Sequence, residues 1–546
     1  MVLQLAKWPA DYGHLLWAVV AMALAVVVRM ATRPAKSPVP VVSGWIPVVS
    51  VTIMYMTNMR AFFAKAKGLL RKMGMVQFQL GPYNTYLISG AENIQTIFRA
   101  SANVGCDLFF LTLKDSIWGA TKEDLAKFAN DKSGRLQKPL AGYEDMPEEK
   151  RIWHGLHTVM STHLTRTQET ENLSVLFEEN FNKVLESFPL GEEKTISVFK
   201  FLLTDMCAAV TKAVNGTRII EDIPNVIPLL WDFDLVAAKL AWGLPRWMAK
   251  GNYEKRDRFH NALVGYLDRA IRDYDWDRQD NPEWEPIFGS RFSRELVQWM
   301  RKADFSLRTM AGGFGTFTLF GANANSIPIT AWCLLYILSS PTLLAAIRAE
   351  LASAPLYLSA PPSCKTKNPS KKINRSALLS LPLLQSIYTE SLRLHVSMNV
   401  TRQVTGPLTI AGVALPEGSV LQAATDIVHH DERIWSAEGH PADEFWAERH
   451  IKVNKDGKRE FQLAAGVNDF FPYGGGPPVC PGRFFAKQQI MLTVAMVVSR
   501  FEVVSEGWVD WEGNPSERGP EDDGRWCGGA SVPPDRDLKV RLRRLW

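Results

Sequence analysis

The sequence has few cysteines, and they form no pairing pattern. Six cysteines are spread over 546 residues, and none of them belongs to a Cys-x-x-Cys pair. Because structural zinc sites and disulfide frameworks use closely spaced cysteines, the sequence argues against both and favours a reducing compartment. A long basic stripe with interleaved aromatic residues is missing too, and the net charge is only +5. These features give no support for nucleic-acid binding.

One stretch near the N-terminus lacks charged residues altogether. Residues 15–28 carry none, and with their flanks they approach the about 20 residues that span a bilayer. Three basic residues and a proline-bearing stretch follow, and basic residues favour the cytosolic side of a membrane. A cleaved signal peptide is the alternative interpretation. We expect three segments: a membrane anchor at 1–33, a stiff linker at 34–50 and a cytosolic catalytic domain at 51–546.

The rest of the chain is mostly helical in pattern. Strand-like pieces appear at residues 75–90 and 406–424, and another ends the chain at 538–545. Residues 307–340 are apolar and nearly uncharged, but Asn325 and Pro328 lie in their middle. This predicts a buried central helix with a local break, not a second membrane span. The predicted fold class is mainly α with small β-sheets (α+β).

One cysteine lies in an unusual loop. Residues 471–482 read FPYGGGPPVCPG, and a helical pattern follows at once. Glycines allow backbone to approach a flat ligand, prolines restrict the loop, and the start of the next helix favours a thiolate at Cys480. Such a thiolate serves as a nucleophile, a zinc ligand or a haem ligand. No histidine base and no second cysteine lie in this segment, whereas haem iron needs one protein ligand on that side.

This loop resembles the haem-binding loop of the cytochrome P-450 enzymes, whose pattern is Phe-x-x-Gly-x-Arg-x-Cys-x-Gly. Gly476, Cys480 and Gly482 match that pattern. Tyr473 replaces the phenylalanine and keeps an aromatic ring, and Pro478 replaces the arginine that usually meets a haem propionate. The resemblance implies haem b as cofactor and Cys480 as the axial thiolate and metal ligand. It also implies that Tyr473, Gly476 and Gly482 help to bind the cofactor.

Two further patterns of the family follow in the expected order. Glu390 and Arg393 form the Glu-x-x-Arg pair in TESLRLH, and Arg449 in FWAERH is the third member of the family's ionic triad. The resemblance implies that this triad fixes the segment before the cysteine loop. A solvated ion pair on a helix is the alternative for Glu-x-x-Arg alone. The family's N-terminal anchor and proline-rich linker are also matched, so the resemblance covers nearly the whole chain.

The resemblance implies contacts to the haem propionates as well. Trp153 and His157 occupy the family's Trp-x-x-x-Arg pattern, with histidine in place of arginine, and Arg402 matches a second propionate-binding arginine. His154 and His157 also form His-x-x-His, which is a possible metal-binding pair on a helix. No carboxylate or cysteine accompanies that pair in the sequence, so the propionate contact is the favoured interpretation.

The central helix differs from the family where protons are delivered. Most members carry an acid and a threonine there, whereas this chain has Ala324 and Asn325. An asparagine amide forms hydrogen bonds but does not titrate. The family's usual proton relay is therefore either absent or rebuilt, and in the second case we expect Asn325, Ser326 and ordered water to form the catalytic relay. The pattern resembles a subgroup that includes cholesterol 7α-hydroxylase, sterol 12α-hydroxylase and prostacyclin synthase, whose fungal relatives often serve specialised metabolism.

This subgroup implies two chemistries. In the favoured one, a monooxygenase takes O2 and electrons that come from NADPH through cytochrome P-450 reductase, and it oxidises a lipophilic molecule such as a steroid or terpenoid. In the alternative, an isomerase rearranges a peroxide without external electrons. A haem protein used only for binding is a remote third interpretation. The resemblance also implies the endoplasmic reticulum membrane, one N-terminal anchor and a catalytic domain in the cytosol.

The substrate pocket and the reductase contact are less defined by the sequence. Apolar pocket walls are expected from four residues, although ordinary core packing is an equal alternative for each: Phe109, Phe110, Phe320 and Val400. Reductase docking would use basic residues on the cysteine side of the haem, with Arg483 and Lys487 as candidates. Solvated surface charges are the alternative for both.

Overall fold

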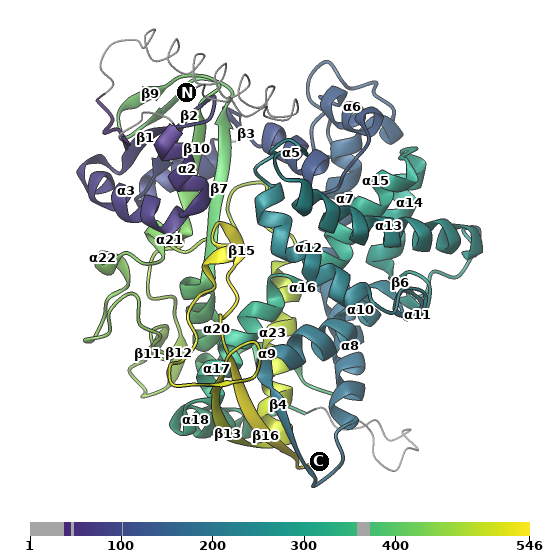
Figure 1. Ribbon diagram of the computed structural model, residues 1–546, viewed down its shortest axis with the longest axis vertical. Coiled ribbons are helices and arrows are strands. Elements are labelled where there is room, and N and C mark those ends of the chain that lie inside the picture. The colour runs from purple at the N-terminus through teal and green to yellow at the C-terminus, as the bar shows by residue number, and fades with distance from the viewer. Residues whose placement is uncertain (1–37, 45–48, 101, 358–371) are drawn as a thin grey trace, which may run out of the picture. The chain divides into compact units, whose positions relative to one another are not determined.

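The computed structural model describes residues 38–44, 49–100, 102–357 and 372–546. The anchor expected at 1–33 and part of the linker expected at 34–50 lie outside the described residues. The described chain is mostly helical with small sheets, as predicted (Figure 1). It divides into two compact units. One holds the described residues up to Gly105 together with Thr401–Ala423, and the other holds Cys106–Val400 and Ala424–Trp546.

The first unit is built on a small mixed sheet. The strands predicted at residues 75–90 are antiparallel partners, and β10 runs parallel to the second of them. Asn58 caps α3 by accepting a hydrogen bond from Ala61 N, and this helix ends at Gly74 with a left-handed backbone. The elements are α2 (Val49–Thr57), α3 (Met59–Met73), β1 (Met75–Leu80), β2 (Tyr83–Ile88), α4 (Ala91–Arg99), β3 (Val104–Gly105), β8 (Leu408–Ile410), β9 (Val413–Leu415) and β10 (Val420–Ala424).

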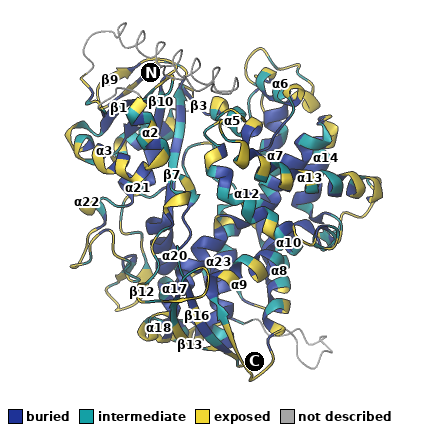
Figure 2. Cartoon of the chain, viewed as in Figure 1, coloured by how far each residue is buried: buried dark blue, intermediate teal, exposed yellow. Residues whose placement is uncertain are grey.

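The second unit is a helical assembly around one large hydrophobic core. Its central helices α17 (Ser326–Leu338), α20 and α23 pack against one another. Figure 2 shows them as mostly buried. The other helices surround them. The principal helices are α5 (Asp107–Ser116), α6 (Lys122–Asn130), α7 (Ile152–Thr165), α8 (Thr167–Glu186), α10 (Cys207–Asn215), α12 (Val226–Leu240), α13 (Lys250–Asp273), α14 (Arg291–Lys302), α18 (Pro341–Ser353), α20 (Pro382–His395) and α23 (Arg483–Arg500).

Short strands complete the second unit. The C-terminal strand predicted at 538–545 is present, and it lies in a four-stranded sheet of order β14-β13-β16-β4. A short strand near the C-terminus, β15, pairs with the start of β7. The strands named here are β4 (Glu193–Ser197), β7 (Val396–Val404), β11 (Ile451–Val453), β12 (Arg459–Phe461), β13 (Phe501–Val509), β14 (Pro515–Ser516), β15 (Gly529–Ser531) and β16 (Asp537–Arg544).

The long apolar segment forms the predicted interrupted central helix. It comprises α15 (Leu307–Phe314), a π-helical stretch (Gly315–Phe320), α16 (Gly321–Asn323), a turn and α17 (Ser326–Leu338). Pro328 lies in the first turn of α17, where a missing N–H removes no helical hydrogen bond, and all but one residue of α17 is buried.

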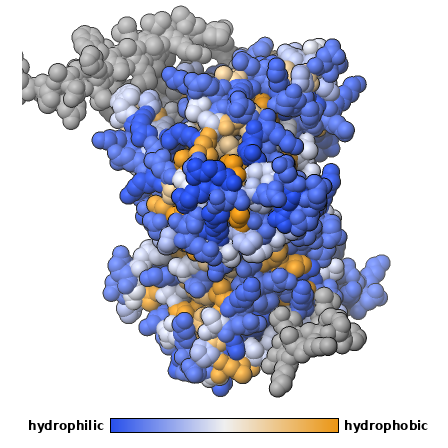
Figure 3. Space-filling view, turned by 90° about the vertical axis from the view of Figure 1, so that its right-hand side faces the viewer, coloured by the Kyte–Doolittle hydropathy of each residue, from blue (hydrophilic) through white to orange (hydrophobic). Residues whose placement is uncertain are grey.

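We found no single helix in the described ranges with the length and apolarity of a membrane span. Among these residues, one pair of helical segments has the length and composition of a span when taken together. The pair is Leu307–Leu338 with Pro341–Ser353, and it is bent by 107° at the break between them. On the face drawn in Figure 3, hydrophobic residues form small separate groups among hydrophilic ones, which is usual for a protein surface.

Candidate haem site

The loop before α23 holds Cys480 in a fixed position. The backbone N–H of Cys480 donates to the carbonyl of Tyr473 at 3.0 Å, so the loop closes on itself. Gly474 and Gly476 have φ values of +74° and +70°, a region that residues with a side chain rarely adopt. Gly476 is one of the glycines that the family pattern requires, and its positive φ explains why a glycine is needed there.

Two effects shift the pKa of the Cys480 thiol in opposite directions. Burial raises the pKa of the thiol, while the backbone N–H groups of Gly482 and Arg483 act in the opposite direction as hydrogen-bond donors to the sulfur. Burial outweighs the donors, so the net effect of these groups is to raise the pKa of the Cys480 thiol. A buried thiolate here needs a positive centre beside it, which a metal ion directly bound to the sulfur supplies.

Tyr473 has a partner that the sequence did not reveal. Its hydroxyl lies 2.6 Å from the hydroxyl of Tyr388 on α20, and burial raises the pKa of both groups. The Tyr388–Tyr473 pair thus satisfies the extra hydroxyl that distinguishes Tyr473 from the family's phenylalanine. It also ties the cysteine loop to α20.

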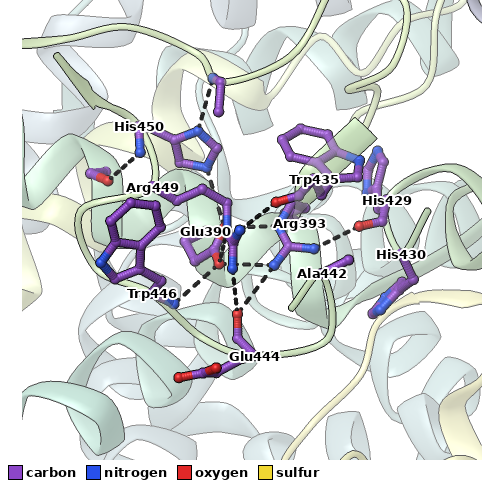
Figure 4. Close-up of polar contacts among 12 residues, drawn as sticks. Glu390, Arg393, His429, His430, Trp435, Ala442, Glu444, Trp446, Arg449 and His450 are labelled. Carbon is purple, nitrogen blue, oxygen red and sulfur yellow. Dashed lines mark hydrogen bonds and ion pairs between the residues drawn. The ribbon is translucent and has the colours of Figure 1, made fainter. Parts of the chain in front are cut away.

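Glu390, Arg393 and Arg449 meet in a fully buried cluster (Figure 4). Arg393 donates to both carboxylate oxygens of Glu390 at 2.8 Å each, and Arg449 Nε donates to Glu390 Oε1 at 2.8 Å. All three side chains are 0% exposed. Burial alone would raise the pKa of Glu390, but hydrogen bonds from Arg393 and His450 hold it well below the usual range.

The triad fixes the segment that leads to the cysteine loop. Arg393 donates to the carbonyl of His429 at 2.7 Å, and Arg449 donates to the carbonyl of Glu444 at 2.9 Å. His429 in turn accepts a hydrogen bond from the backbone N–H of Phe471, at the start of the loop, at 3.1 Å. A continuous chain of contacts therefore joins α20 to the residues that present Cys480.

His450 is a member of this cluster that the sequence interpretation missed. In the structure its Nε2 lies 3.3 Å from Glu390 Oε2, and its side chain is 0% exposed. Trp446 N also donates to Glu390 Oε1 at 3.2 Å. The carboxylate of Glu390 thus accepts from several donors, as a buried charge requires.

The residues predicted to contact the haem propionates differ in how far their polar groups are already bonded within the protein. On α7, the indole N–H of Trp153 donates to the carbonyl of Phe128 at 2.9 Å, so this donor is used within the protein. His157 is half-buried, and burial lowers its pKa. His154 approaches Glu148 at 3.0 Å. The described residues contain no group of three metal-ligating side chains.

A buried lysine beside Trp153 is a further feature that the sequence did not point to. Lys114 on α5 is 4% exposed, and burial lowers its pKa to about 7. No hydrogen bond or ion pair joins its ammonium to another described residue. Four aromatic rings surround it, with centroid distances of 5.6 Å to Phe110, 4.7 Å to Trp118, 4.5 Å to Phe128 and 4.5 Å to Trp153.

The break in the central helix exposes one of its faces. Gly321 and Asn325, one turn apart, are exposed, whereas their neighbours Asn323, Ala324 and Ser326 are buried. Asn325 Oδ1 accepts a hydrogen bond from the N–H of Ser531 in β15 at 3.1 Å, and its amide NH2 forms no hydrogen bond with another described residue. The Ser326 hydroxyl donates to the carbonyl of Ala322 at 2.9 Å. Of the two predicted relay residues, Asn325 alone presents a free donor on the exposed face.

The predicted pocket residues are distributed around these elements. Phe320 meets Phe233 of α12 edge-on at 5.4 Å, and Phe109 and Phe110 are half-buried neighbours on α5. Val400 is 6% exposed, and a Cβ built on Gly474 would lie 3.9 Å from its side chain. The structure therefore brings Val400 to the cysteine loop.

The remaining candidates are basic residues. Arg402 is 9% exposed and lies in the first unit, so its predicted propionate contact stays a prediction. Arg483 donates to the carbonyl of Cys480 at 2.8 Å, and Lys487 donates to Gln385 Oε1 at 2.9 Å. Burial lowers the pKa of Lys487. Both docking candidates are thus engaged close to the loop.

Comparisons with known proteins agree with this site. A family model described as "Cytochrome P450" matches residues 108–510. The cytochrome P450 monooxygenase calL of Penicillium decumbens is 41% identical over 538 residues, which cover 97% of this chain and 98% of the relative. The cytochrome P450 monooxygenase fsoE of Humicola fuscoatra is 26% identical over 560 residues, which cover 96% of this chain and 90% of the relative.

A more distant match concerns a sterol enzyme. The 7-alpha-hydroxycholest-4-en-3-one 12-alpha-hydroxylase of Oryctolagus cuniculus is 27% identical over 272 residues, 48% of this chain and 50% of that protein. The fold and the Cys480 loop define a mainly helical protein with one cysteine held in a restrained loop before a mostly buried helix. The chain belongs to the cytochrome P450 family, as a monooxygenase. The predicted resemblance to this family and its sterol hydroxylases is confirmed.

Proposed function

We propose that this protein uses O2 and reductase-supplied electrons to hydroxylate or otherwise oxidise a lipophilic small molecule. A steroid, a terpenoid or a related specialised metabolite is the proposed substrate class. The observation that carries the proposal is Cys480, which is half-buried, restrained by its loop and approached by two backbone N–H donors. The fungal monooxygenases among the relatives support the same reaction type.

The residues around the site fit haem b. A buried thiol that needs a positive partner suits an axial ligand of iron. On the propionate side, no carboxylate of the described residues pairs with Lys114. Arg135 lies 4.4 Å from the Trp153 ring, and its one ion pair with a described residue is to Asp107, which is 54% exposed. Lys114 and Arg135 are two cations with one neighbouring carboxylate, Asp107, so the binding of an additional anion would be favourable there. When bound, the haem would supply iron for the activation of O2.

The chain's own residues would divide the remaining tasks. Cys480 would hold the iron, and Lys114, Arg135 and His157 would hold the propionates. The amide NH2 of Asn325 lies on the exposed face of the central helix, and there it would orient a water molecule by donating a hydrogen bond to it. The apolar side chains of Phe109, Phe110, Phe320 and Val400 would exclude water and bind the substrate.

A membrane location belongs to the same proposal. We place an anchor at 1–33, a linker at 34–50 and a cytosolic catalytic domain at 51–546, in the endoplasmic reticulum beside NADPH–cytochrome P450 reductase. Trp247 and Met248, between α12 and α13, are 57% and 51% exposed, with Arg246 and Lys250 beside them. An exposed tryptophan beside an exposed methionine, flanked by basic residues, suits a membrane interface.

An isotope experiment tests the reaction. Membranes that contain the protein are supplied with sterols and terpenoids, NADPH, the reductase and heavy O2, and products are detected by mass spectrometry. A product that carries one heavy oxygen and requires NADPH is expected. Products without the label, formed from added peroxides with no NADPH, would instead establish the isomerase reaction that the sequence left open.

Replacement of Lys114 by methionine should weaken haem binding. Loss of a charge-assisted hydrogen bond costs about 1.5–3 kcal/mol, so we expect haem affinity to fall at least about tenfold and the reduction potential to fall, because a cation near the haem is removed. Haem retention on gel filtration and a redox titration measure these effects. Lys114→Arg should restore both.

Lys127 provides a matched control for this prediction. Its ammonium also lies over an aromatic ring, Phe305, at 5.0 Å, but it pairs with Asp124 at 3.1 Å. Lys127→Met should leave haem retention and potential unchanged. Equal values for wild type and Lys114→Met would show that Lys114 does not meet a propionate.

Replacement of Asn325 by alanine should uncouple electron use from product formation. Removal of one hydrogen-bonding group is worth about 1 kcal/mol, so we expect the fraction of NADPH recovered as product to fall about fivefold. Ser326→Ala is the control, because the Ser326 hydroxyl is already bonded to the carbonyl of Ala322. Equal uncoupling in both variants would contradict a specific role for Asn325.

A further inference from the structure

One carboxyl on α12 lacks a cationic partner. Asp234 Oδ2 accepts a hydrogen bond from the indole N–H of Trp526 at 2.9 Å, and no charged side chain among the described residues pairs with it. Asp232 on the same helix behaves differently, since it pairs with Lys255 at 3.1 Å and lies 3.9 Å from Arg258. Asp234 is therefore an uncompensated acid, whereas its neighbour is an ordinary surface ion pair.

The surroundings of Asp234 make this arrangement costly. Its carboxyl lies deep in the protein, and burial raises its pKa to about 7, with only partial relief from the Trp526 hydrogen bond. The residue as a whole is half-buried. A buried acid without a cation destabilises a fold unless something else requires it. Such groups are frequent at functional sites.

Asp234 lies among elements already assigned to the substrate side. The preceding residue, Phe233, meets the pocket residue Phe320 edge-on at 5.4 Å. The segment that carries Trp526 continues to Ser531, whose N–H donates to Asn325 at 3.1 Å. Through these contacts, α12, the C-terminal segment and the break in the central helix pack against one another.

We propose that Asp234 is the polar anchor of the substrate, which is a lipophilic molecule with one hydrogen-bond donor, a hydroxyl or an ammonium group. This inference rests on the proposed function, because it assigns a recognition group to the same site. Trp526 occupies Oδ2 and leaves Oδ1 for the ligand. A carboxylate accepts from such a donor more strongly than a neutral group does, and a site built for a donor rejects the analogue without it.

Three probes of one shape test the anchor. 1-Adamantanol, 1-adamantylammonium and 1-methyladamantane differ only in the substituent, and their binding to the haem-loaded full chain is followed at pH 8 by the optical shift of the haem. In wild type, the alcohol and the ammonium should bind at least about tenfold more tightly than the methyl compound, a difference of about 1.4 kcal/mol. Asp234→Leu should abolish both preferences, and Asp234→Asn should abolish only that for the ammonium.

The controls separate this inference from the proposed function. Asp232→Asn, on the same helix, should leave all three affinities unchanged. Equal binding of the probes to wild type, no binding of either donor probe, or a preference that survives in Asp234→Leu would each overturn the anchor. A thiolate-type haem spectrum recorded beforehand shows that the haem ligation on which the proposed function depends holds even then. A spectrum without thiolate ligation would overturn the proposed function itself.

The stability of Asp234→Asn gives a second readout. The pKa of Asp234 is raised in the folded state from its ordinary value of 3.8, so the native state loses stability as pH rises from about 4 to about 7 and the carboxyl ionises. The variant escapes this loss, and its Tm should exceed that of wild type at pH 8 and equal it near pH 4. A lower Tm at pH 8 would identify Asp234 as a structural link to Trp526 and overturn the anchor.

Discussion

Replacement of Cys480 by serine should abolish the thiolate-type haem spectrum and bring turnover below detection. Serine is nearly the same size, and the hydrogen bond from the backbone of residue 480 to Tyr473 does not involve the side chain. The loop should therefore keep its conformation, while the ligand that pushes electron density onto iron is lost. The optical spectrum of the reduced carbon monoxide complex measures the first effect, and the labelled-O2 assay measures the second.

Cys527 is the matched control for this variant. Its thiol is also half-buried, and it lies 3.2 Å from the Ser397 hydroxyl, outside the loop before α23. Cys527→Ser should retain the thiolate-type spectrum. Circular dichroism of Cys480→Ser should match wild type, because the substitution removes a ligand and no packing. A thiolate-type spectrum that persisted in Cys480→Ser would refute the central assignment of this site.

The parts of the fold that depend on local sequence could be predicted. The strands at 75–90, the interrupted central helix and the helix after Cys480 all follow from periodicity and from glycine and proline positions. The spacing Glu-x-x-Arg places Glu390 and Arg393 on one helix face, and their contact in the structure needs only that helix.

The missed residues depend on contacts between distant parts of the chain. Tyr388 and Tyr473 are 85 positions apart, and Asp234 and Trp526 are 292 apart. Neither pair has a spacing that a local pattern can reveal. Lys114 has the appearance of an ordinary helix charge in the sequence, because lysine is rarely buried. Only the packing of α5 against Phe128 and Trp153 shows that its ammonium is enclosed.

The same reasoning explains why burial changed the interpretation of Cys480. The sequence shows the helix start that favours a thiolate, but it does not show how much apolar surface covers the sulfur. In the structure, burial outweighs the two N–H donors. Burial of the sulfur therefore opposes the effect of the helix start, and only the structure shows this second effect.

Replacement of Glu390 by glutamine should destabilise the protein severely. Gln has the same shape, but it leaves Arg393 and Arg449 buried without their shared carboxylate. Removal of one partner from a buried ion pair costs about 3–5 kcal/mol, a large part of the about 5–15 kcal/mol by which a domain is stable. We expect a fall of this size in the free energy of unfolding, measured by urea denaturation, together with loss of bound haem, since the triad fixes the segment that leads to Phe471.

Glu448 is the matched control for the triad, because it lies beside Arg449 and forms an exposed ion pair with Arg459 at 2.7 Å, with side chains 52% and 46% exposed. Exposed pairs contribute about 0–1 kcal/mol, so Glu448→Gln should leave stability and haem content close to wild type. Both variants remove one negative charge from a glutamate that pairs with arginine. The difference between their free energies of unfolding therefore measures the effect of burying the ion pair. Equal stability of Glu390→Gln and Glu448→Gln would mean that the buried arginines find other acceptors. The backbone carbonyls of His429 and Glu444 would then suffice to fix the segment.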